Sequence, residues 1–145
     1  MKWIHVLIIT IKIIYRIVMK TFLKRLLLLS AVLLAIMAVV ALVNEKYFEP
    51  VFFAIPIYFG LITLLLYCGV NKVIANNPKR FMSVYMLMQF GEMFLHIVVL
   101  FAFVYFNFQI AKMFTIYFVV NYIVYTIFGK RELMKLVKSD AKNNQ

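Results

Sequence analysis

The chain has 145 residues, of which 66% are hydrophobic, and a formal net charge of +11. Soluble domains are about 45–50% apolar, so this chain has too little polar surface to enclose its apolar side chains in water. Its lysines and arginines lie between apolar stretches and form no separate basic domain, which favours anionic lipid over nucleic acid as a partner. The single cysteine, Cys68, excludes an intramolecular disulfide and disfavours a zinc or iron–sulfur site.

The N-terminal segment, residues 1–25, is predicted to be a basic amphipathic helix. Its basic residues from Lys12 to Lys24 recur every four positions and share one helical face, while apolar side chains fill the other faces. Such a helix lies in the membrane interface with its basic face on the lipid headgroups. Five residues are expected to contact headgroups: Lys12, Arg16, Lys20, Lys24 and Arg25. In an alternative reading, Met19 is the true start and the last three of these form the basic flank of the first span.

Four stretches are long and apolar enough to cross a bilayer as helices of about 20 residues. They cover residues 26–43, 51–70, 81–106 and 110–128. Only helices or closed barrels satisfy the backbone in lipid, and these runs lack the alternation of barrel strands. Short connections make successive helices antiparallel neighbours. The sequence therefore predicts an all-α integral membrane protein, a four-transmembrane-helix up-down bundle with an N-terminal basic amphipathic helix.

Lysine and arginine are divided unevenly between the two sides of the predicted bundle. All 16 except Lys46 and Lys112 fall in the N-terminal segment, in the loop 71–80 or in the basic tail 129–145. By the positive-inside rule, both termini are cytoplasmic. The expected location is the cell's inner, or cytoplasmic, membrane.

Three features predict where the helices bend or end. Asn77 followed by Pro78 predicts a turn between the second and third spans. Pro56 and Gly60 predict a kink in the second span. The polar residues after Lys138 are expected to be disordered.

The third span carries the only acid within the four spans, Glu92. A charge at the bilayer centre costs roughly 2.5–3.5 kcal/mol, so such an acid usually faces a partner or a cavity. Helical spacing places three polar neighbours on the same face: Tyr85, Gln89 and His96. A second polar stripe follows the fourth span: Tyr117, Asn121 and Tyr125.

The two stripes are predicted to face one another. Counting inward from Arg80 and Gly129 places Tyr117 level with Glu92, and Asn121 level with Gln89. His96, one turn from Glu92, is a candidate to pair with it. These groups are either interhelical contacts, worth about 0.6 kcal/mol each in a well-studied membrane protein, or a functional site in which Glu92 exchanges protons or meets a partner's charge.

Catalysis and metal binding lack the residues that they need. Ser30 and Ser83 have no His and Asp arranged around them, and the four glycines form no phosphate-binding loop. A metal at Glu92 and His96 would lack further ligands. We therefore expect no enzyme activity, no cofactor and no metal. Cys68 is expected to be a small buried residue, with palmitoylation as an alternative.

Gly91 and Glu92, in the third of four spans of a small basic protein, resemble the ATP synthase protein I family. Members have two helices, a polar cytoplasmic loop and a third helix carrying a Gly-Glu pair with a lysine shortly after. Here Leu95 stands at the lysine's position and His96 follows. The likeness covers about residues 26–128 and leaves the N-terminal segment unexplained. It implies a non-catalytic accessory protein that assists assembly of the rotor ring of the ATP synthase membrane sector, with other membrane subunits as partners.

Two alternative functions stay open. A small proton or cation carrier, or a membrane subunit of a larger transporter, would use Glu92 and His96 as a relay. Four short helices enclose little volume, so a self-contained carrier would form a homo-oligomer. A structural membrane subunit would instead bind anionic lipid through its basic rim.

Overall fold

The computed structural model describes residues 2–143, apart from the side chains at positions 11, 14, 15, 47, 78, 140 and 143. Four long helices run through this part: α1 (Lys2–Val43), α2 (Ala54–Asn76), α3 (Phe81–Phe106) and α4 (Ala111–Asn143). Each provides a stretch able to cross a membrane: Arg16–Val43, Pro50–Asn76, Phe81–Phe106 and Ala111–Ser139. The chain is a multi-pass membrane protein, and the predicted all-α architecture with four spans is confirmed.

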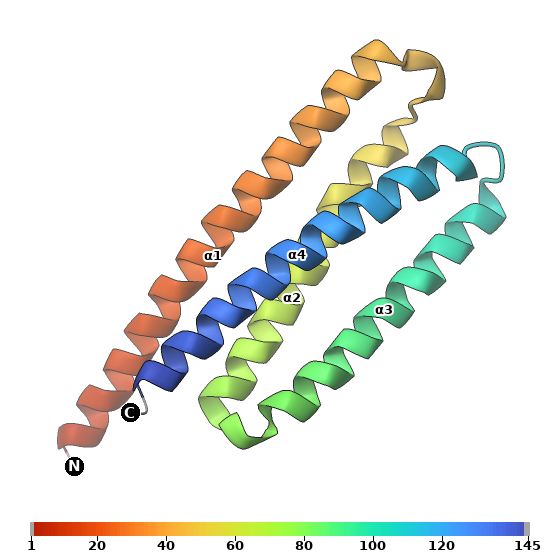
Figure 1. The fold of residues 1–145 in the computed structure, drawn as a ribbon. Helices are drawn as coiled ribbons and strands as arrows, with labels where there is room; N and C mark the ends of the chain where they lie inside the picture. Colours follow the sequence, from red (N-terminus) through yellow and green to blue (C-terminus); the bar gives the residue numbers. More distant parts are fainter. Residues whose placement is uncertain (1, 144–145) are drawn as a thin grey trace.

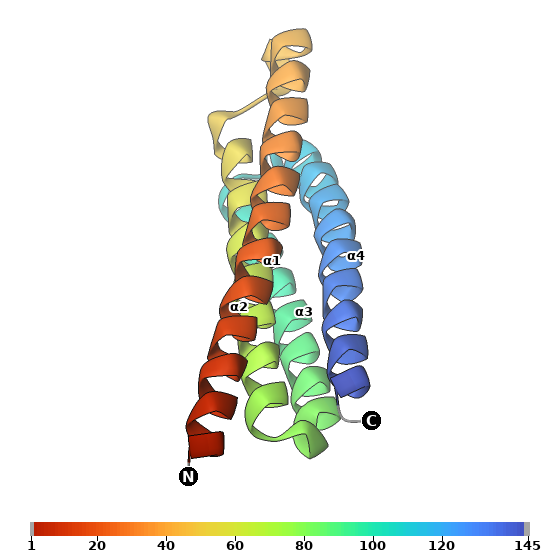
Figure 2. The ribbon, with the colours of Figure 1, turned by 90° about the vertical axis from the view of Figure 1, so that its left-hand side faces the viewer.

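Successive helices run in opposite directions, so the two chain ends and the α2–α3 turn lie at one end of the molecule (Figure 1). We call this the basic end, because all lysines and arginines except Lys46 and Lys112 lie toward it. α2 and α4 form the central pair, with α1 on one side and α3 on the other, as Figures 1 and 2 show. Their shared core is largely aromatic and includes Phe22, Phe59, Phe114, Phe118 and Tyr125.

The breaks between helices confirm one prediction and correct another. α2 ends at Asn76, and the short 3-10 helix Pro78–Arg80 leads into α3, as the Asn77–Pro78 pair predicted. Pro56 does not kink a long helix, because it lies in the first turn of α2, directly after the 3-10 helix Pro50–Phe53. The N–H groups of a first helical turn have no partner within the helix, so a proline there removes no hydrogen bond.

The N-terminal segment is helical, as predicted, but it is continuous with the first span. The 42 residues of α1 measure roughly 63 Å at 1.5 Å per residue, about twice the thickness of a bilayer's hydrocarbon core. Its described side chains before Val18 are exposed. Val18, Met19 and Phe22 are the first side chains of α1 to pack on the core. The first turns of α1 therefore extend beyond the bundle.

The C-terminal tail is more ordered than the sequence predicted. The fourth span was expected to end at Phe128 and disorder to begin after Lys138, whereas α4 is helical through Asn143. Two contacts stabilise this extension on the bundle. Glu132 forms an ion pair of 3.0 Å with Arg25 of α1, and Leu136 is buried in the core. The expectation of disorder was wrong because no proline or glycine follows Gly129 to end the helix, so the exposed residues after Lys138 continue the helix that the packed residues before them form.

Candidate functional site

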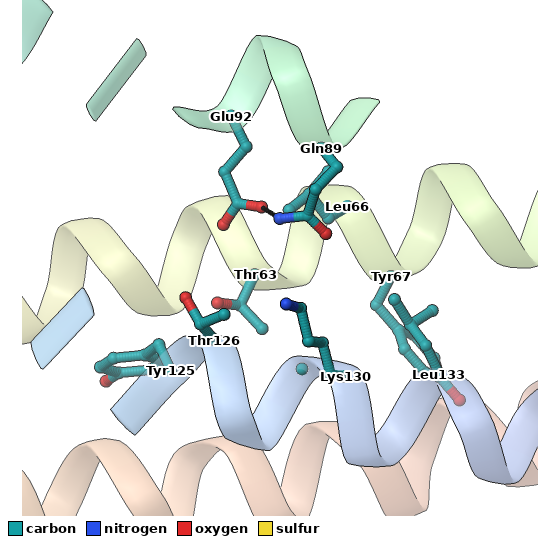
Figure 3. A pocket seen from close by; sticks show the side chains of 10 residues that line it. Thr63, Leu66, Tyr67, Gln89, Glu92, Tyr125, Thr126, Lys130 and Leu133 are labelled. Carbon is teal, nitrogen blue, oxygen red and sulfur yellow. Dashed lines mark hydrogen bonds between the residues drawn. The ribbon is translucent and has the colours of Figure 1, made fainter. Parts of the chain in front are cut away.

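Glu92 lies on the face of α3 that points toward α2 and α4 (Figure 3). Its carboxylate accepts a hydrogen bond of 3.0 Å from Nε2 of Gln89, one turn earlier on the same helix. Thr63 of α2 and Thr126 and Lys130 of α4 line the same small cavity. The carboxylate of Glu92 is therefore directed into its own bundle.

The cavity beside Glu92 is large enough for water. Its volume is about 30 Å³, and one water molecule needs about 10–15 Å³ together with two to four polar partners. Carboxylate, amide, hydroxyl and ammonium groups all line this cavity. The Lys130 side chain reaches toward Glu92 and Gln89 (Figure 3), and its charge acts on the carboxylate. The site is thus an acid and a base that face one another across a water-sized space.

The predicted pairing of the two polar stripes is wrong. Tyr117 packs against Phe52, with ring centroids 5.2 Å apart, and does not lie opposite Glu92. Asn121 is buried and donates from Nδ2 to the carbonyl oxygen of Tyr117 on its own helix, at 2.8 Å. It does not meet Gln89, which lies opposite the later residues of α4 that line the cavity.

The register of α3 against α4 was predicted wrongly because the residues of the fourth span were counted from the wrong end point. A tight turn at residues 107–110 joins α3 to α4 and sets their register. Two ring contacts show this register: the ring centroids of Phe103 and Phe114 are 3.5 Å apart, and those of His96 and Tyr122 are 5.3 Å apart. The prediction counted instead from Gly129, as though the fourth helix ended there. Since α4 continues for several turns past that residue, the count was displaced by roughly two and a half turns at 3.6 residues per turn.

This register also changes the depth assigned to Glu92. The charge-free stretch of α1 begins after Arg25, which is level with Glu132 of α4 because the two form an ion pair of 3.0 Å. The charge-free stretch of α4 ends at Lys130, which lines the cavity with Glu92. Glu92 therefore lies near the basic edge of the apolar band shared by these helices. Its position looked central because the apolar stretch of α3 continues back to Phe81.

His96 is buried, but it does not pair with the carboxylate of Glu92. Its Nδ1 lies 2.6 Å from the main-chain oxygen of Glu92. A carbonyl oxygen only accepts, so Nδ1 donates and carries the proton. The ring stacks on Phe59 with centroids 4.8 Å apart and an interplanar angle of 8°. His96 thus serves the packing of α2 against α3.

Tyr85 and Tyr125 have different environments, and of the two only Tyr125 lines the cavity beside Glu92. Tyr85 stacks on Phe81 near the basic end, with centroids 5.8 Å apart. Tyr125 is buried, and its hydroxyl donates a hydrogen bond of 2.9 Å to the carbonyl oxygen of Pro56. The same hydroxyl lies 2.7 Å from Oγ of Ser30 on α1. Tyr125 is therefore an interhelical contact of the kind that the sequence offered as one reading of these stripes.

Sequence reasoning missed Lys130 and Thr126 as site residues. Lys130 was assigned to the tail because the fourth span was ended too early. A signal was present, since Tyr122, Thr126 and Lys130 repeat at spacing four and form a second polar face on α4. Thr126 and Lys130 of that face line the cavity, together with Tyr125 of the predicted stripe, whereas Tyr117 and Asn121 do not.

The predicted headgroup residues lie along α1. Lys12, Arg16 and Lys20 line one shallow hollow, Lys24 is exposed, and Arg25 pairs with Glu132. Among the residues that the structure describes, no group of three His, Cys, Asp or Glu side chains is placed to hold a metal ion.

A scan of protein-family models and searches of curated proteins and solved structures find no match to this chain. The class therefore rests on its own architecture. The chain is an all-α membrane protein with four spans, in which one acid and one base share a small internal cavity.

Proposed function

We propose that this chain is a non-catalytic accessory protein that assists assembly of the rotor ring of a rotary ATP synthase. The observation that carries the proposal is the Gly91–Glu92 pair on α3, which resembles the motif of the ATP synthase protein I family. The two residues point to different surroundings. Glu92 faces the bundle interior, whereas a Cβ built at Gly91 would meet no described atom within 4 Å.

The open side of α3 around Gly91 is the surface that we assign to a rotor subunit. Phe90 and Phe94, nearby on the same helix, are 67% and 69% exposed, so Gly91, which has no side chain, leaves a notch beside an exposed apolar surface. A glycine at such a position lets a partner helix approach the backbone closely, which favours helix association in lipid. Glu92 then contributes indirectly, because Lys130 of α4 lines the same cavity and its positive charge favours the orientation in which the carboxylate faces α4.

The proposed orientation places the basic end in the cytoplasm. The positive-inside rule supports this, because only Lys46 and Lys112 lie toward the opposite end. Both termini then face the compartment in which rotor subunits are synthesised.

Copurification tests the proposal. The chain, tagged after Gln145, is extracted from its native membranes in mild detergent, and rotor subunits are quantified by mass spectrometry. We expect the wild type to enrich rotor subunits and Gly91→Ile to lose most of them, because the added side chain fills the notch. Ala35→Ile, at an exposed position within the first span, is the matched control and should retain them. Absence of rotor subunits from the wild-type preparation would overturn the proposal.

The water-sized cavity favours a second candidate, a small proton or cation carrier centred on Glu92 and Lys130. His96 is not among the residues that line this cavity, so the relay from Glu92 to His96 that the sequence offered has less support. Flux into proteoliposomes that disappears in Glu92→Gln would favour the carrier. A flux equal to that of protein-free liposomes would exclude the carrier function.

A further inference from the structure

A second hollow lies at the basic end of the molecule, between α3 and α4. Its α3 side includes Phe81, Met82 and Tyr85, and its α4 side includes Lys130, Met134 and Lys138. Its volume is about 360 Å³, more than ten times that of the cavity beside Glu92. We call it the α3–α4 groove.

The α3–α4 groove combines an apolar floor with positive charge. Met82 and Met134 are 61% and 60% exposed within it. Lys130 and Lys138 lie on the same helix, roughly 12 Å apart at 1.5 Å per residue. No acid lines the groove among the side chains that the structure describes. The nearby acid Glu132 is already engaged by two ion pairs outside the groove, with Arg25 at 3.0 Å and with Lys135 at 2.8 Å.

The depth of the α3–α4 groove suits a lipid headgroup. On α4 it begins at Lys130, where the apolar band ends, and continues to Lys138, away from the band. Phospholipid phosphates lie at this boundary, and lysines there attract anionic headgroups by electrostatics. The exposed methionines would be left in contact with water unless an apolar chain covers them.

We propose that the α3–α4 groove binds one anionic phospholipid of the surrounding bilayer. Its phosphate lies between Lys130 and Lys138, and an acyl chain covers Met82 and Met134. A phospholipid supplies both the anion and the apolar chain in one molecule. The shallow hollow beside Lys12, Arg16 and Lys20 is a less suitable lipid site, because residues of α1 alone line it. Lys130 lines both the groove and the cavity of Glu92, so the bound phosphate and the carboxylate share one cation.

Native mass spectrometry of the delipidated full chain tests the site. The protein is titrated with phosphatidylglycerol or with phosphatidylcholine of the same acyl chains. The charge variant is Lys130→Ala combined with Lys138→Ala. Its matched control is Lys20→Ala combined with Lys24→Ala on α1, which removes the same charge outside the groove.

We expect phosphatidylglycerol to bind more tightly than phosphatidylcholine. The groove variant should weaken phosphatidylglycerol binding by about five-fold for each lysine, and the α1 control by much less. Val137→Trp, which fills the groove without changing charge, should also weaken it. Equal losses in the two double variants, or complete displacement of the lipid by inorganic phosphate, would overturn the proposal. Thermal melting of every variant shows that the bundle is intact.

Discussion

The hydroxyl of Tyr125 on α4 donates a hydrogen bond of 2.9 Å to the carbonyl oxygen of Pro56 on α2. It also lies 2.7 Å from the hydroxyl of Ser30 on α1, which must donate in that contact. One buried side chain therefore connects three helices. Hydrogen bonds between membrane helices average about 0.6 kcal/mol and reach about 1.7 kcal/mol.

Tyr125→Phe should lower the free energy of unfolding by about 1–2 kcal/mol, because it removes both contacts and keeps the ring. Equilibrium unfolding in detergent measures the change. Tyr105→Phe is the matched control, since Tyr105 is 83% exposed, and it should leave stability unchanged. Equal effects of the two substitutions would contradict the role given to Tyr125.

Two glycines should respond differently to alanine. A Cβ at Gly60 would lie 3.2 Å from Oγ of Ser30 and 3.7 Å from the hydroxyl of Tyr125, so Gly60→Ala should disturb this three-helix contact and destabilise the bundle by about 1 kcal/mol or more. Gly91→Ala meets open space and should have no such effect. Thermal melting of the two variants side by side measures the difference. A stable Gly60→Ala variant would show that the helices adjust at no cost.

The ion pair between Arg25 and Glu132 should show a small coupling energy. The Arg25 side chain is 47% exposed, and ion pairs of exposed groups contribute about 0.2–1 kcal/mol. A double-mutant cycle with Arg25→Ala and Glu132→Ala should give a value in this range that falls with added salt. The cycle of Lys24→Ala with Glu132→Ala should give none. Equal coupling in both cycles would mean that Glu132 senses only the overall charge of α1.

Cysteine labelling tests the proposed orientation. In a Cys68→Ala background, Asn77→Cys lies in the α2–α3 turn and Asn44→Cys in the α1–α2 connection, at opposite ends of the bundle. A membrane-impermeant maleimide added to intact cells should label only the cysteine at 44. In inverted vesicles it should label only the cysteine at 77. The reverse pattern would place the basic end outside.

The ends of a helix were predictable from the sequence where polar residues flank an apolar stretch. The third span was predicted residue for residue as Phe81–Phe106, because Arg80 precedes it and Asn107 follows it. The end of α4 was not, because hydropathy falls after Phe128 although the helix continues. Its turns past Phe128 pack on the bundle through Leu136 and through the ion pair of Glu132 with Arg25, a residue more than a hundred positions away. A local pattern carries no information on such a contact.

The candidate site was predictable within one helix and not between helices. Spacing alone placed Gln89 beside Glu92, and the structure gives their hydrogen bond at 3.0 Å. The residues opposite depend on the register of α3 against α4, which the turn at 107–110 sets. Lys130 was therefore missed as a site residue. Its position four residues after Thr126, which puts the two side chains on one face of α4, was the signal that could have indicated it.

The amount of assembled rotor ring in the membrane tests the central claim most directly. It is measured by native gel electrophoresis of membranes from cells that lack this protein, and from the same cells supplied with wild type, Gly91→Ile or Ala35→Ile. We predict that the ring is depleted without the protein, is restored by wild type and Ala35→Ile, and stays depleted with Gly91→Ile. A normal amount of ring in cells that lack the protein would contradict the account.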